Sequence, residues 1–215
     1  ILCIICLLYY HKNSTFIVGT LKGAAQHQFI EPLYQMERFY TDRNENGFQY
    51  LLNTSKIELD AYIDWEVNTD RNVDRLEVFT SAFNLKQKYQ LGESHLFSPN
   101  IQFVYRHMGP SNGASSLPLR TLINSAIGAE YTYQKGDKKL RLLSYFLDYR
   151  DLSISPGLSF LDGFGQYHTI QYSPNKKWDS MGNFCEGTER QSPIGGAICQ
   201  AVNPSDNSLP ALKKQ

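Results

Sequence analysis

Residues 56–68, KIELDAYIDWEVN, alternate apolar and polar side chains without a break. Odd-numbered positions from Ile57 to Val67 are apolar, and the even-numbered ones from Glu58 to Asn68 are acidic, Tyr or Asn. Strict period 2 predicts a β-strand, because successive side chains of an extended chain point to opposite sides. Twelve residues at roughly 3.3 Å each, tilted by about 45°, cross about 28 Å, close to the hydrocarbon thickness of a bilayer. The apolar face can rest on a soluble core or on lipid.

Other segments of the chain also have the composition and alternation of strands. They are residues 15–23, 47–54, 74–91, 98–107, 119–134, 139–150 and 165–173. Gly, Asn, Asp and Ser mark the turns between them, and Ser55 with Lys56 predicts a tight hairpin. The predicted fold is all-β: an antiparallel meander of about eight or nine long amphipathic strands, forming a transmembrane β-barrel or a fragment of one.

Composition and hydrophobic periodicity divide the chain into three parts. Residues 1–13 are an apolar N-terminal segment that resembles the centre of a signal peptide or a buried strand. Residues 14–173 hold the predicted meander, within which 28–40 is a short helix or an irregular edge, because Pro32 argues against a central strand. Residues 174–215 lack periodicity and predict an irregular or disordered tail.

Composition excludes several classes of function. The 21 basic and 21 acidic residues cancel, which gives no electrostatic argument for binding nucleic acid. No apolar run reaches the roughly 18–20 residues of a membrane-spanning helix. The five His residues are scattered, and neither a catalytic motif nor a nucleotide-binding motif is present. The sequence therefore predicts no catalytic residue, no cofactor and no metal.

The acidic face of 56–68 consists of Glu58, Asp60, Asp64 and Glu66. Their spacing would suit the two carboxylates of a glycosidase, but an acid catalyst needs an apolar pocket that raises its pKa. A solvated row that lines a lumen is the favoured interpretation. The opposite face, predicted to contact lipid, consists of Ile57, Leu59, Ile63, Trp65 and Val67.

Aromatic residues recur near the ends of the predicted strands. The set predicted to lie at the membrane interfaces is Tyr89, Tyr105, Tyr131, Tyr133 and Tyr149. Rings of this kind are stable where hydrocarbon meets water. The alternative is that aromatic residues simply favour strands in any sheet.

Several short motifs together resemble a known family. They are V-G-T-L at 18–21, I-E-P-L-Y at 30–34, D-W-E at 64–66 and T-L-x-N-x-A-x-G at 121–128. In this order the chain, over about residues 14–173, resembles poorly characterised, porin-like outer-membrane β-barrel proteins of Bacteroidota. The resemblance implies location in the bacterial outer membrane, and it carries over no active residue.

The predicted function is accordingly non-enzymatic: a porin-like outer-membrane segment with a role in solute passage or envelope structure. Its expected partners are outer-membrane lipid and small hydrophilic solutes, without nucleic acid. The main alternative is a soluble β-sandwich that binds carbohydrate, with two sheets around one dry core. An enzymatic alternative requires two of the acidic residues in a concave pocket.

Overall fold

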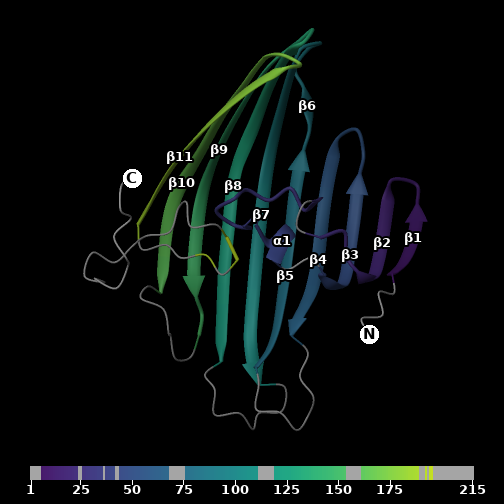
Figure 1. The fold of residues 1–215 in the computed structure, drawn as a ribbon, viewed down its shortest axis with the longest axis vertical. Coiled ribbons are helices and arrows are strands. Elements are labelled where there is room, and N and C mark those ends of the chain that lie inside the picture. Colours follow the sequence, from purple (N-terminus) through teal and green to yellow (C-terminus); the bar gives the residue numbers. More distant parts are fainter. Residues whose placement is uncertain are drawn as a thin grey trace.

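A computed structural model describes residues 6–23, 26–35, 37–41, 44–67, 76–110, 119–153, 161–188, 192 and 194–195. It shows a single curved antiparallel sheet of eleven strands, in which neighbours in space are neighbours along the chain (Figure 1). The strands are β1 (Cys6–His11), β2 (Ser14–Thr20), β3 (Asn46–Asn53), β4 (Ile57–Val67), β5 (Leu76–Gln87), β6 (Tyr89–Gln90), β7 (His95–Pro110), β8 (Arg120–Lys135), β9 (Lys138–Asp151), β10 (Asp162–Asn175) and β11 (Trp178–Thr188). The short β6 pairs only with β7, and the sheet does not close between β1 and β11.

The predicted fold class is confirmed, with two differences in extent. The described residues form eleven strands rather than eight or nine, because Cys6–His11 and Trp178–Thr188 are strands at the two edges and Tyr89–Gln90 is a separate short strand. Trp178–Thr188 falls in the segment predicted to be irregular; it pairs along its length with β10. The sandwich alternative is wrong for the described residues, which form one sheet and not two facing ones.

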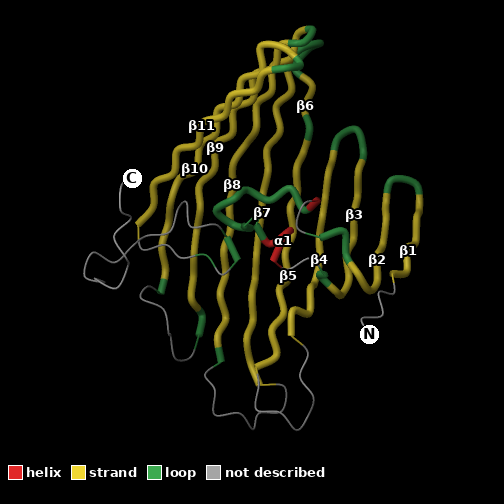
Figure 2. The backbone as a smooth tube through the Cα atoms, viewed as in Figure 1, coloured by secondary structure: helices red, strands yellow, loops and turns green. Residues whose placement is uncertain are grey.

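The two ends of the sheet differ in their connections. At one end, two or three residues join β1 to β2, β3 to β4, β8 to β9 and β10 to β11. These tight turns lie at the top of Figure 2, and they include the predicted hairpin at Ser55 and Lys56. At the other end the connections are longer: residues 21–45, 68–75, 111–119 and 152–161. We call these the short-turn end and the long-loop end.

The connection 21–45 folds back across the inner face of the sheet instead of extending beyond it (Figure 1). It contains the one-turn helix α1 (Arg38–Thr41) and a series of turns. Its apolar side chains Phe29, Ile30 and Leu33 are buried against the small and aromatic side chains that the strands present there. The core of the described chain therefore lies between this segment and the sheet.

The outer face of the sheet carries exposed apolar side chains. Register places them in rows across the strands, as in the run Leu59–Leu85–Ile101–Ile127–Phe146 from β4 to β9. Ile127 and Phe146 are 60% and 63% exposed, respectively. Among the described residues, no helix has the length and apolar character to cross a membrane.

Close packing between β8 and β9 requires glycine at position 128. A Cβ atom there would lie 2.1 Å from the carbonyl oxygen of Ser144 and 2.7 Å from the ring of Tyr145. We expect Gly128→Ala to lower the free energy of unfolding by about 1–3 kcal/mol, measured by urea denaturation of the folded protein. The matched control is Gly182→Ala in β11, where a Cβ would meet only Ile170 at 3.7 Å. Equal stability of the two variants would contradict this account.

Candidate functional site

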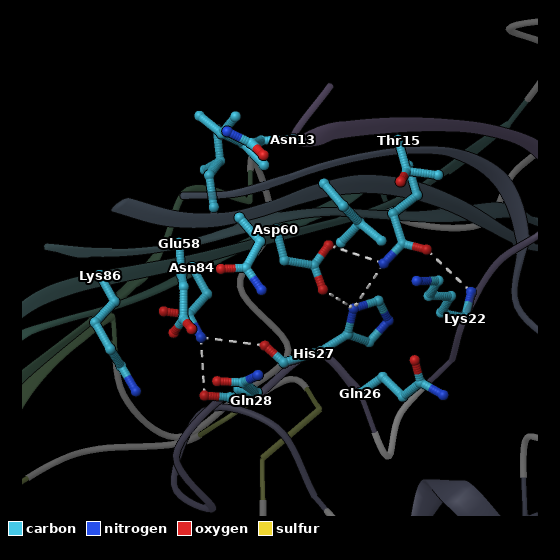
Figure 3. A pocket seen from close by; sticks show the side chains of 15 residues that line it. Asn13, Thr15, Lys22, Gln26, His27, Gln28, Glu58, Asp60, Asn84 and Lys86 are labelled. Atoms are coloured by element: carbon cyan, nitrogen blue, oxygen red, sulfur yellow. Dashed lines mark hydrogen bonds and ion pairs between the residues drawn. The ribbon is translucent and has the colours of Figure 1, made fainter. Parts of the chain in front are cut away.

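A polar cavity of about 230 Å³ lies on the inner face of the sheet, between the strands and segment 21–45 (Figure 3). Its walls come from the β1–β2 turn, from β2 to β5, from Lys22 and from residues 26–28. Charged side chains at its edge include Lys22, Glu58 and Lys86. Amide side chains of Asn and Gln provide much of the remaining lining. The cavity is thus suited to polar groups.

His27 forms the wall of this cavity, and its ring is held on both sides by carboxylates. Nδ1 lies 2.8 Å from Asp60 of β4, and Nε2 lies 2.7 Å from Glu45. The imidazole stacks on Tyr62 with ring centroids 4.0 Å apart and is 0% exposed. Tyr34 donates its hydroxyl proton to the other oxygen of Glu45.

Electrostatics fix the protonation state of this group. Burial alone would lower the pKa of His27, but hydrogen bonds and charge from Asp60 and Glu45 outweigh it and raise the pKa to about 9. Burial would likewise raise the pKa of Glu45, yet His27 and Tyr34 hold the pKa of that carboxyl below its usual value. At neutral pH the group is therefore an imidazolium that donates to two carboxylates.

This arrangement suits a residue that holds two segments of the chain together, and not one that transfers a proton. A general base needs a free nitrogen within reach of the substrate, whereas both nitrogens of His27 are engaged and the ring is enclosed. Among the described residues, no group of three or more His, Cys, Asp or Glu side chains is arranged to hold a metal ion. We interpret His27 as the residue that fastens segment 21–45 to β4.

The four residues of the predicted acidic row point to the inner face, and each has a partner in the protein. Asp60 also accepts a hydrogen bond from Gln49, and Asp64 accepts one from the backbone of Asn46. Glu66 pairs with Arg106 at 2.6 Å, and Glu58 pairs with Lys88. Asp60 and Asp64 are only 8% and 3% exposed, because segment 21–45 covers them. Their predicted role as a lumen lining stays a prediction.

The residues predicted to contact lipid lie on the outer face, with one exception. Ile57, Leu59 and Ile63 are half-buried, and Trp65 is 37% exposed. A bulge follows Trp65 and pairs Val67 with Val78. Val78 precedes the outward-facing Phe79 and therefore lies on the opposite face of the sheet. Val67 thus does not belong to the outer row. That these side chains contact lipid stays a prediction.

Of the predicted interface aromatics, Tyr105 lies in one strip of aromatic rings, Tyr89, Tyr131 and Tyr133 lie in a second strip, and Tyr149 is buried. The long-loop strip consists of Phe48, Trp65, Phe79, Tyr105 and His107, whose neighbouring ring centroids lie 5.4–6.4 Å apart. The short-turn strip consists of Tyr89, His95, Phe97, Tyr131 and Tyr133. Tyr149 is 0% exposed on the inner face, which does not fit the exposed position that an interface residue needs.

A second histidine, His107 near the end of β7, lies on the outer face. Its Nδ1 is 3.0 Å from the hydroxyl of Thr121, its register partner on β8. The ring packs against Phe79 and Tyr105, with centroids 5.4 and 6.3 Å away. Thr121 is held in turn, because its backbone N–H donates to Ser153 and its carbonyl accepts from Leu152. Both His107 and Thr121 are half-buried.

Sequence patterns did not single out either histidine. His27 and Asp60 are 33 positions apart, and His107 and Thr121 are 14 apart, so no short motif joins them. The local signals for the second pair were its place near the ends of two predicted strands and the position of Thr121 at the start of the motif at 121–128.

The chain matches the model of the Lipid A 3'-O-deacylase-type family over residues 1–214. It belongs to that family. No curated protein matches the chain, and no solved structure does either.

Family membership corrects three predictions. The family is named for an enzymatic reaction, so the predictions of a non-enzymatic protein, of porin-like function and of transport are wrong. The resemblance to outer-membrane proteins agrees with the family, but the resemblance to porins does not, because the family is not one of porins. Lipid A is a lipid of the outer membrane, so a lipid partner and association with that membrane agree with the family; solutes are not addressed.

The charge state of His27 makes the stability of the protein depend on pH. Its pKa is raised from 6.5 to about 9 on folding. Its contribution, on the order of 3 kcal/mol, is therefore fully present below the unfolded pKa and lost as the pH rises through the folded one. We expect the urea midpoint to fall between pH 6.5 and pH 9 in the wild type.

The control for this prediction is His27→Gln, whose urea midpoint should change less over the same range. Direct NMR titration of the imidazole provides an independent test that needs no variant. An imidazole that titrates at its ordinary pKa in the folded protein would contradict the assignment.

Proposed function

We propose that this chain is a lipid A 3'-O-deacylase of the bacterial outer membrane, which hydrolyses the ester that joins an acyl chain to the 3' oxygen of lipid A. The family match over residues 1–214 carries this proposal. The reaction consumes water and releases a fatty acid. It needs a protein surface that meets the lipid where the ester lies, between hydrocarbon and sugar.

The two faces of the sheet support a membrane location. A lipid-facing strand has apolar side chains on one side and polar ones on the other. Here the outer row of β4, with Ile57, Leu59 and Ile63, belongs to the exposed apolar face, whereas Asp60 and Asp64 are covered. We assign this outer row to contact with lipid.

The spacing of the two aromatic strips also supports this location. Phe97 of the short-turn strip and Tyr105 of the long-loop strip are eight positions apart on β7. At roughly 3.3 Å per residue and a tilt of about 40°, that distance corresponds to about 20 Å of height, similar to the roughly 25 Å apolar band of barrels. Each strip then lies near one membrane interface.

The lengths of the connections suggest an orientation. Outer-membrane barrels place short turns toward the periplasm and longer loops outside the cell. The long-loop end, with residues 68–75, 111–119 and 152–161, would then face outward. Lipid A occupies the outer leaflet, so the long-loop strip would lie at the depth of its ester bonds.

Trp65 reports whether the outer face contacts hydrocarbon. The chain has two Trp residues, so Trp178→Phe leaves Trp65 as the single fluorophore. We expect its emission to be blue-shifted and quenched by phospholipids brominated along the acyl chain, after the protein is inserted into vesicles. The reciprocal variant, Trp65→Phe, serves as the control. Emission that iodide quenches and brominated lipid does not would refute lipid contact.

The reaction itself can be tested on lipid A. We expect expression of the full-length protein in a Gram-negative host to produce lipid A that lacks one 3'-O-linked acyl chain, detected by mass spectrometry of the extracted lipid. Purified protein added to lipid A vesicles should release the corresponding fatty acid. Unchanged lipid A in both experiments, with protein present in the outer membrane, would show that the proposed function is wrong.

A further inference from the structure

We propose that Thr121 and His107 are the nucleophile and general base of the ester hydrolysis, and this inference rests on the proposed function. Hydroxyl nucleophiles are recognised by a hydrogen bond to a base. Within the described residues, His107 is the histidine whose hydrogen-bond partner is an aliphatic hydroxyl, at 3.0 Å. His27 binds carboxylates, and His95 binds the phenol of Tyr131.

The position of the pair suits a membrane substrate. Thr121 is the second residue of β8 and His107 is three residues from the end of β7, so both lie at the long-loop end. Both face outward, on the side opposite the enclosed His27. His107 also belongs to the long-loop strip, which we place at the depth of the ester. An acyl chain in the bilayer would reach this pair without entering the interior of the sheet.

The surroundings fix the geometry of the two side chains. Phe79 and Tyr105 flank the imidazole, and the hydrogen bonds to Ser153 and Leu152 hold the Thr121 backbone. Gly109 follows His107 on the same face, and a Cβ atom there would lie 2.7 Å from Nε2. Glycine at position 109 therefore leaves the room that the imidazole of His107 needs.

The reaction divides into two balanced steps. In the first, Thr121 Oγ1 attacks the ester carbonyl carbon while His107 Nδ1 takes the hydroxyl proton. The bond from that carbon to the 3' oxygen breaks, and His107 returns the proton to this oxygen, which leaves acyl-Thr121 and a free sugar hydroxyl. In the second, water attacks the acyl carbon, His107 takes its proton and returns it to Thr121 Oγ1, and the fatty acid departs.

Substitutions at the pair test this assignment through the rate of lipid A deacylation by the full-length protein. We expect Thr121→Val, which keeps the shape and removes the hydroxyl, and His107→Gln each to lower the rate at least about 100-fold. Thr121→Ser should retain activity. His95→Gln is the matched control, because His95 makes a similar hydrogen bond to Tyr131 at the short-turn end; it should leave the rate unchanged.

A covalent readout separates a chemical role from a structural one. In the wild type, peptide mass spectrometry should find a fluorophosphonate adduct on Thr121, and His107→Gln should lose it. An active Thr121→Val protein would overturn the inference while leaving the proposed function intact. Inactive wild type that still labels at Thr121 would refute the function and support the pair, whereas wild type that neither deacylates nor labels would refute both.

Discussion

The inner face of the sheet carries many polar side chains beside its apolar core, and the buried polar groups must find hydrogen-bond partners. An unpaired buried carboxylate or amide costs several times what a formed hydrogen bond contributes. Segment 21–45 supplies the partners: Asn84 donates to the carbonyl oxygens of His27 and Gln28, and the backbone N–H of Ile30 donates to Gln102. Asp60 is satisfied by the ring of His27. This interaction determines where the chain between β2 and β3 runs and what the inner face can do.

Covering the inner face separates the two histidines by function. His27 is a buried, charged residue that holds segment 21–45 against β4; its pKa is raised, and a substrate cannot reach it. His107, on the other side of the same sheet, keeps a hydroxyl partner and lies among aromatic rings at the strand ends. A substrate embedded in a bilayer approaches from the outer face. The fold therefore directs the proposed chemistry outward, away from the polar cavity beside His27.

Sequence patterns predicted the strands well where one face is apolar and the other polar. In β4, β7 and β8 the alternation follows from the different surroundings of the two faces, so a short stretch of sequence is enough to predict the strand. Trp178–Thr188 was missed because nearly all of its side chains are exposed, and an exposed edge strand has no contrast between faces. Its position is set by backbone pairing with β10, and this pairing requires no alternation of apolar and polar side chains.

The sequence by itself determined an antiparallel all-β chain with an apolar and an acidic face on β4, because alternation depends only on adjacent residues. The tertiary structure decided what those faces meet: Asp60 meets His27 from 33 positions away, and His107 meets Thr121 across a strand pair. Such contacts depend on loop closure and register, which no local pattern encodes. For the same reason, alternation indicated a polar face on β4 but left open whether water or another segment of the chain would cover it.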